Sequence, residues 1–320
     1  MEASREGLTL VGRKPLFGLP TSCPFCLPVF IYLKFSRTPF HFHINFSMPD
    51  FDQIPYVEVG AYVAYNNEKG GVIGSLRDSG VADLDSRVAS IPEFVSMTAM
   101  VTTWLKDAVE YELWLGYDGA LAYDIYYSDL PWPLGKLLCL KQIHALRFRF
   151  GITKDNTEQK EAEIFKRVQM AYEALSTRLG EDDYFFEDRP SSLDAAFLGH
   201  ALFTLQALPE SSVLRIKLLE HGNLVRYAEK HKATCLDAAS SSHGEGFIPT
   251  PASSIPRQGT KPKRKQRRER TEEEKNFRKK TKYFLIAQVI AVLSFLTIMN
   301  RSDDGDVDFD EEDSDVVDYD

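Results

Sequence analysis

The chain has 320 residues, enough for about two globular domains, and its 43% hydrophobic and 27% charged residues are close to globular averages. These values exclude a mostly disordered chain and an array of membrane spans. The net charge of -9 belongs to the C-terminus, because residues 301–320 hold one Arg and eleven Asp or Glu. Four cysteines are too few for a secreted disulfide framework, so we expect a reducing compartment.

The first 86 residues alternate strand and helix signals and predict a small α/β domain. Residues 8–11 are a short apolar run, and residues 40–44 alternate with the period of a strand. Between them, residues 27–35 have the pattern of a helix. Residues 56–59 and 61–65 flank Gly60, and this arrangement predicts a hairpin.

Residues 87–236 predict an all-helical domain. One helix face is marked by four apolar residues at helical spacing: Ile164, Val168, Ala171 and Leu175. Gly180 follows at the place of a C-terminal cap. Ser191 and Asp194 form an S-x-x-D capping box. The helix after this box is apolar on nearly all sides, which predicts that it lies at the centre of the domain.

After residue 236 the pattern predicts a tether, a membrane span and a tail. Residues 237–270 are rich in Ser and Pro and end in a basic run, as in a disordered tether. Residues 271–300 contain the uncharged stretch 283–299, which predicts a transmembrane helix just long enough for a thin bilayer. The Lys and Arg residues before the stretch predict a cytosolic body, with the acidic tail 301–320 across the membrane.

The basic run at 261–270 has two interpretations. Such a cluster can be a nuclear import signal or a nucleic-acid patch. Beside a membrane span, topology and attraction to anionic headgroups explain it better, so we expect the lipid bilayer as a partner and no nucleic acid.

Cys23 and Cys26, separated by Pro24 and Phe25, are the candidates for covalent chemistry. At the start of a helix the dipole stabilises a thiolate, and two cysteines at this spacing can exchange with disulfides. A zinc site needs about four ligands, and a second pair is missing, so no metal is expected.

Several other side chains allow both a functional and a structural interpretation. His41 and His43 share one face of a strand and can chelate a metal, or can simply be exposed edge residues. His200 is most simply a hydrogen-bonded core histidine. A group of aromatic residues can form either a docking surface or core: Trp104, Trp114, Trp132, Tyr123, Tyr126 and Tyr127.

Taken in order, these features resemble the glutathione transferase architecture, with a thioredoxin-like N-terminal domain and a helical C-terminal domain. Residues 18–35, 62–73, 172–200 and 221–230 are moreover similar to plant members of the metaxin family. The resemblance implies a cis peptide bond before Pro55. It also implies a subunit of the mitochondrial outer-membrane machinery that imports, sorts and assembles β-barrel precursors.

The sequence departs from the transferase pattern at the ligand site. Where transferases hold glutathione with an acidic residue followed by Ser, this chain has Asn66, Asn67 and Glu68, and the segment before Pro55 is short. A residual glutathione-like pocket would consist of Cys23, Pro55 and Asn67. We therefore expect no cofactor and no enzyme activity.

These inferences predict a tail-anchored protein of the mitochondrial outer membrane. Its body would face the cytosol as a precursor receptor or scaffold, and its partners would be a β-barrel insertase, the other subunits of the sorting and assembly complex, and precursor proteins. One alternative is a membrane-tethered glutathione-dependent transferase or thiol oxidoreductase that uses Cys23 and Cys26. Another is a tail anchor in the endoplasmic reticulum, because a short span with basic flanks favours the mitochondrial outer membrane without excluding other membranes.

Overall fold

The computed structural model describes residues 7–45, 53–60, 62–236, 288 and 294. The expected tether at 237–270, the span at 283–299 and the acidic tail at 301–320 lie outside the described residues, apart from Gln288 and Ser294 of the span. Within the described part, no helix combines the length and the apolar character needed to cross a bilayer.

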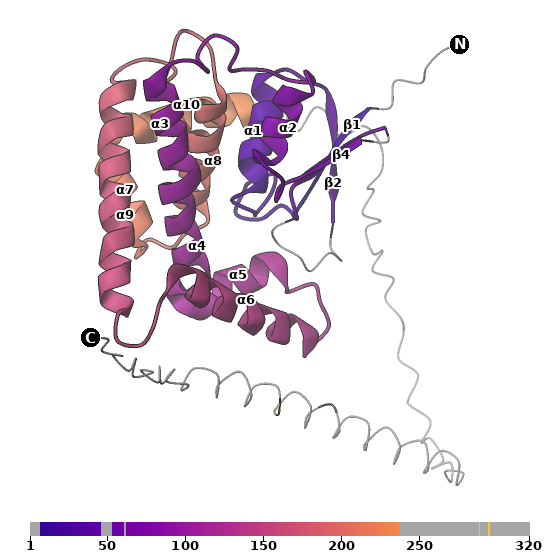
Figure 1. Cartoon of the computed structure of the whole chain (residues 1–320), viewed down its shortest axis with the longest axis vertical. Coiled ribbons are helices and arrows are strands. Elements are labelled where there is room, and N and C mark those ends of the chain that lie inside the picture. Colours follow the sequence, from indigo (N-terminus) through magenta and orange to yellow (C-terminus); the bar gives the residue numbers. More distant parts are fainter. Residues whose placement is uncertain (1–6, 46–52, 61, 237–287, 289–293, 295–320) are drawn as a thin grey trace, which may run out of the picture. The chain divides into compact units, whose positions relative to one another are not determined.

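The N-terminal part is a four-stranded sheet covered by two helices (Figure 1). The strands are β1 (Leu8–Gly12), β2 (Phe40–Ile44), β3 (Tyr56–Val59) and β4 (Tyr62–Tyr65), in the spatial order β2-β1-β3-β4. The helices are α1 (Cys26–Phe35) and α2 (Gly71–Asp78). β1 is parallel to β2, which requires a crossover connection, and α1 provides it. This is the expected thioredoxin-like arrangement.

The local predictions for this part are confirmed. Val59 pairs with Tyr62 across the hairpin turn, where Gly60 adopts a left-handed conformation with φ of 60°. The Ile54–Pro55 peptide bond is cis, as the family resemblance implied. Both helices lie on the side of the sheet that faces the helical part (Figure 1).

The helical part begins with a continuous helical run and continues through separate helices. The run consists of α3 (Pro92–Met100), the π-helical turn η1 (Val101–Leu105) and α4 (Lys106–Trp114). The remaining elements are the 3-10 turn η2 (Gly116–Gly119), α5 (Ala120–Tyr126), α6 (Leu134–Phe150), α7 (Thr157–Leu179), α8 (Ser192–Gln206), α9 (Val213–Leu219) and α10 (Gly222–Leu236). The four residues predicted to mark a helix face are buried on α7. Gly180 ends that helix with φ of 54°, and its N–H donates to the carbonyl of Ser176.

Helix α8 is central, as its sequence predicted, and its capping box is formed. The Asp194 N–H donates to Ser191 Oγ at 3.4 Å, and the Ser191 N–H donates to Asp194 Oδ2 at 2.9 Å. The same carboxylate accepts hydrogen bonds from the Phe185 N–H at 3.1 Å and from the Tyr227 hydroxyl at 2.9 Å. The buried carboxylate thus connects the start of α8 to the preceding loop and to α10.

Helix α8 also joins the helical part to the α/β part. It packs along α1, and the approach is so close that a Cβ at Gly199 would lie 2.7 Å from the Pro28 ring. At the start of α8, the Ser192 N–H donates to Asp85 Oδ1 at 2.8 Å. One continuous core runs through both parts, and the described residues up to Leu236 form one compact unit.

Candidate functional site

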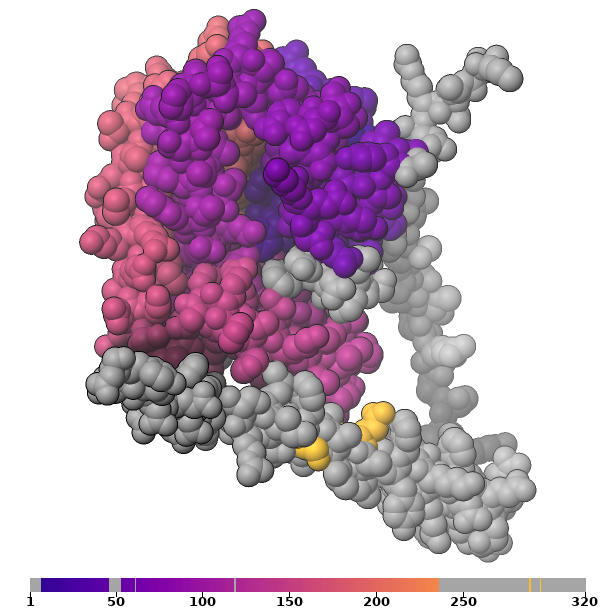
Figure 2. All heavy atoms as spheres, in the orientation of Figure 1, coloured from indigo at the N-terminus to yellow at the C-terminus, as the bar shows by residue number. Residues whose placement is uncertain are grey.

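A cleft of about 540 Å³ opens between the α/β part and the helical part. Its α/β wall is the first turn of α1, the turn that leads from β4 into α2, and α2 itself. Its helical wall comes from α3, η1, α4 and α8. Figure 2 shows the hollow between these walls on the molecular surface. The cleft therefore exists only because segments far apart in the chain are packed together.

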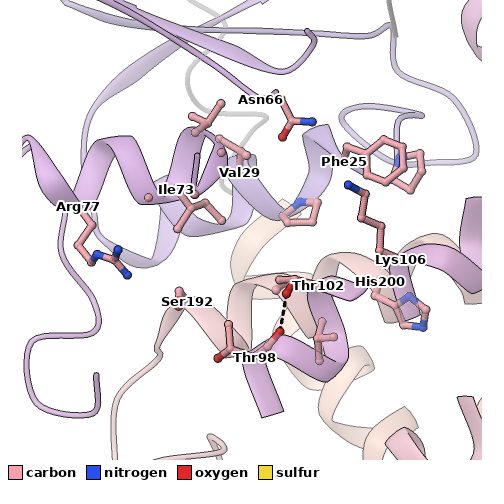
Figure 3. A pocket seen from close by; sticks show the side chains of 18 of the residues that line it. Phe25, Val29, Asn66, Ile73, Arg77, Thr98, Thr102, Lys106, Ser192 and His200 are labelled. Carbon is pink, nitrogen blue, oxygen red and sulfur yellow. Dashed lines mark hydrogen bonds between the residues drawn. The ribbon is translucent and has the colours of Figure 1, made fainter. Parts of the chain in front are cut away.

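The lining of the cleft mixes apolar and polar residues, Glu68 among them, with a cation toward each end (Figure 3). Val29, Ile73 and Val101 provide apolar lining. Lys106 extends over the ring of Phe25, with Nζ 5.5 Å from the ring centroid, and burial lowers the pKa of this ammonium group. At the other end, Arg77 forms ion pairs with Asp78 and Asp85. A cleft of this kind can bind an apolar group that carries a negative charge.

His200 lines the cleft from α8 but is almost fully buried. Its Nε2 lies 2.7 Å from the hydroxyl of Tyr172, so the prediction of a hydrogen-bonded core histidine is confirmed. Burial lowers the pKa of His200 to about 3. The ring is therefore neutral at physiological pH and presents no charge to the cleft.

The two candidate thiols lie outside the cleft. Cys23 and Cys26 are both completely buried, and neither lines the cavity, whereas Pro24 and Phe25 between them do. Cys23 Sγ is 3.4 Å from the hydroxyl of Tyr126, whose ring stacks on Trp114 at 5.2 Å between centroids. Both cysteines are free thiols. Pro24 and Phe25 thus separate the thiols from the space that a ligand would occupy.

The two thiols nevertheless differ in acidity. Burial by itself raises the pKa of Cys23, but hydrogen bonds from Cys26, from Tyr126 and from backbone N–H groups outweigh it and lower the pKa to about 7. Burial raises the pKa of Cys26 well above its usual range, and the neighbouring Cys23 raises it further. The pair is therefore one acidified thiol beside one protonated thiol, both without access to solvent.

The other residues of the predicted residual pocket also lie away from the lining. Pro55 is buried, and Asn67 is exposed. Its neighbours Asn66 and Glu68 line the cleft instead. None of Cys23, Pro55 and Asn67 contributes to the cleft wall, so the structure does not bring these three residues together around it.

The two strand histidines are exposed, whereas the aromatic group divides between core and surface. His41 and His43 are exposed on the edge strand β2, and the described residues contain no group of three potential ligands around a metal position. Half of the aromatic group is buried in the core, namely Trp114, Tyr126 and Tyr127, and Trp104 and Tyr123 are partly buried against it. Trp132 differs, with 78% of its surface exposed.

Sequence analysis did not identify Lys106 or the outer surface of α6. Lys106 becomes notable only when Phe25, far away in the chain, is placed beneath it. For α6 a signal was available: residues 130–152 contain four Lys or Arg and no Asp or Glu.

Comparisons with known proteins agree with this architecture. Two family models match the chain, the glutathione S-transferase N-terminal domain at residues 24–119 and the glutathione S-transferase C-terminal domain at residues 168–231. The chain is 52% identical over 315 residues to the "Mitochondrial outer membrane import complex protein METAXIN" of Arabidopsis thaliana, covering 98% of this chain and 100% of that protein. It is 25% identical over 184 residues to human Metaxin-2, covering 56% of this chain and 68% of that protein. Among solved structures, the β-etherase LigF of Sphingobium sp. strain SYK-6 aligns with a TM-score of 0.49 and 14% identity, covering 73% of this chain and 99% of that one.

Proposed function

This chain belongs to the metaxin family, and we propose that it is a subunit of the mitochondrial outer-membrane import complex. In this role it acts without catalysis, as a cytosol-facing receptor or scaffold for β-barrel precursors. Its partners are the β-barrel insertase and the other subunits of the sorting and assembly complex. The proposal is supported by the full-length similarity to a protein that carries the import-complex name.

The observation that carries the non-catalytic role is the position of the thiols relative to the cleft. A glutathione-dependent or disulfide-exchange reaction requires direct contact between sulfur atoms. Here Cys23 is fully buried behind Pro24 and Phe25, while the cleft beside it is open. An open, partly apolar cleft without a reachable nucleophile supports binding, and an apolar segment of a precursor with a carboxylate near Lys106 would fit it.

The location at the membrane is part of the same proposal. The uncharged stretch 283–299 anchors the chain, and the basic residues before it keep the folded part in the cytosol. Tethering then keeps the cleft at a high effective concentration near the insertase, so individually weak contacts are sufficient. Deletion from Tyr283 onward is expected to release the protein from mitochondria. Retention of the shortened chain after carbonate extraction would contradict the anchor.

A thiol enzyme is the rival function, and the lowered pKa of Cys23 favours it. The import-complex role and the enzyme role are distinguished by the double variant Cys23→Ser with Cys26→Ser, expressed in mitochondria that depend on this protein. We expect unchanged assembly of β-barrel precursors and no thiol-transfer activity in either protein. A measurable transfer rate that the double variant loses would establish the enzyme instead.

The receptor role itself is tested at the cleft. Lys106→Gln removes the cation over Phe25 and is expected to lower crosslinking of radiolabelled precursors to the protein. Lys166→Gln, on the exposed surface of α7, is the matched control. Equal crosslinking by both variants would show that precursors do not use the cleft.

A further inference from the structure

Helix α6 exposes a surface that its neighbours leave uncovered. The helix lies at one end of the helical part, across the direction of α4 and α7 (Figure 1). Of its 17 residues, only Gly135, Cys139 and Leu146 are buried. Four large apolar side chains on α6 and the residues that lead into it are exposed, by 78%, 44%, 50% and 87% respectively: Trp132, Leu134, Leu140 and Phe148. We call these residues, with Lys136, Lys141 and Arg147, the α6 face.

The α6 face is positively charged. Residues 130–152 contain no Asp or Glu to neutralise it. In the described part of the chain, Lys141 and Arg147 form no ion pair, and the ammonium of Lys136 lies 4.2 Å from the ring centroid of Tyr123. Arg149, in contrast, turns back to the body and pairs with Glu110 and Asp107. Lys141 and Arg147 are therefore exposed and available to an anionic surface, whereas Lys136 lies against Tyr123.

Some of the apolar and basic side chains of the α6 face share one direction, while Lys136, Leu140 and Arg147 lie roughly 100–140° round the helix from them. A helix advances about 100° per residue, so side chains seven positions apart almost coincide. Leu134, Lys141 and Phe148 are spaced in this way, and Ala145 lies beside them. The long stems of lysine and arginine can lie among apolar groups while their charges reach outward. The combined surface can thus insert apolar side chains and contact phosphates at the same time.

We propose that the α6 face docks onto an anionic lipid surface, as a second membrane contact besides the predicted span. Trp, Phe and Leu next to Lys and Arg are typical of helices that lie in the headgroup region, and each basic residue gains from an anionic leaflet. Protein interfaces are enriched in Trp, Phe and Arg but depleted of Lys, so it is the net positive charge of this face that favours an anionic lipid surface. A second copy of this chain is a poor occupant because two such faces repel each other. This inference holds whether or not the cleft binds precursors.

Helix α7 provides the internal control. It is exposed along one side like α6, but its carboxylates and cations alternate, and Glu163 pairs with both Lys160 and Arg167. Met170 is its exposed apolar residue, at 49%. Because its charges are paired and of both signs, we expect this surface of α7 not to bind an anionic bilayer.

The test places a fluorescent label on each surface of the full-length protein. All four native cysteines are buried, so a polarity-sensitive fluorophore will attach selectively to a new exposed cysteine. Ala145→Cys places it on the α6 face without removing any of the residues proposed to touch lipid, and Met170→Cys places it on α7. Each protein is reconstituted into vesicles of phosphatidylcholine alone or of equal parts phosphatidylcholine and phosphatidylserine, with a nitroxide on the lipid headgroup as quencher.

We expect blue-shifted, quenched emission at position 145 in the anionic vesicles, and neither effect at position 170. Lys141→Gln with Arg147→Gln should reverse the effect at 145. Because each basic residue near an anionic surface contributes roughly fivefold, the two changes together lower the equilibrium for the docked state about 25-fold.

Three results would overturn the proposal. Absence of quenching at 145 in both kinds of vesicle would show that the face does not touch lipid. Equal quenching at 145 and 170 would show only that the tether holds the body near the bilayer. A blue shift at 145 without vesicles that disappears when residues 301–320 are deleted would assign the face to the acidic tail of the same chain.

Discussion

Helices α8 and α6 belong to the same helical part and have similar lengths, but they use their apolar residues in opposite ways. Twelve of the 15 residues of α8 are buried, against three of the 17 residues of α6. The apolar residues of α8 join the two parts of the molecule, through its contact with α1. Within the described residues, three large apolar residues of α6 are instead left exposed near the unpaired cations Lys141 and Arg147: Leu134, Leu140 and Phe148. Apolar character alone therefore does not distinguish a core helix from a docking helix, whereas the accompanying charges do.

The largest expected effect on the free energy of unfolding comes from a substitution at the start of α8. Asp194→Ala removes the acceptor for Ser191, Phe185 and Tyr227 and leaves their donors buried without partners. We expect a loss of about 3 kcal/mol in the free energy of unfolding, measured by urea denaturation. Asp182→Ala, at an exposed position nearby, is the control. A loss below about 1 kcal/mol would mean that the capping box does not determine the stability of α8.

A smaller effect is expected from the titration of His200. Its pKa is lowered to about 3 in the folded protein, so between that value and the usual 6.5 the unfolded chain binds more protons. Stability is therefore complete above pH 6.5 and decreases as the pH falls, by about 2 kcal/mol between about pH 7 and pH 5. His200→Gln, which does not titrate, should flatten this part of the stability profile. An unchanged slope would contradict the assignment.

The next effect tests the contact between α8 and α1. Gly199→Ala places a methyl group 2.7 Å from the Pro28 ring, and we expect about 1–2 kcal/mol of destabilisation although alanine favours helices. Gly222→Ala, where a Cβ would meet no atom within 4 Å, is the matched control and should be neutral or slightly stabilising. If the two variants unfold alike, the helices can separate more easily than the structure indicates.

The smallest effect is expected on α6. Phe148→Ser removes a large apolar side chain of which 87% is exposed, so the free energy of unfolding should change by no more than about 0.5 kcal/mol. The same variant should weaken the lipid contact reported by the label at position 145. A clear loss of stability would show that Phe148 contributes to packing and would weaken the contrast with α8.

Elements governed by near neighbours could be predicted from the sequence. The hairpin around Gly60, the face of α7 and the capping box at Ser191 follow from spacing and local hydrogen bonding, and the structure contains all three. Four stretches of the sequence, at residues 18–35, 62–73, 172–200 and 221–230, also indicated the family that the comparisons show. The predicted span at 283–299 rests on the same kind of local pattern and stays a prediction.

Only the tertiary structure decided which residues form the cleft and which thiols are sealed from it. Phe25, Lys106 and His200 come from three separate regions of the chain, and no local pattern relates them. The CxxC spacing indicated reactivity, but accessibility depends on Tyr126 and on the side chains that cover Cys23. Local sequence determines backbone conformation through interactions over a few residues, whereas cavities and exposure result from packing between distant segments.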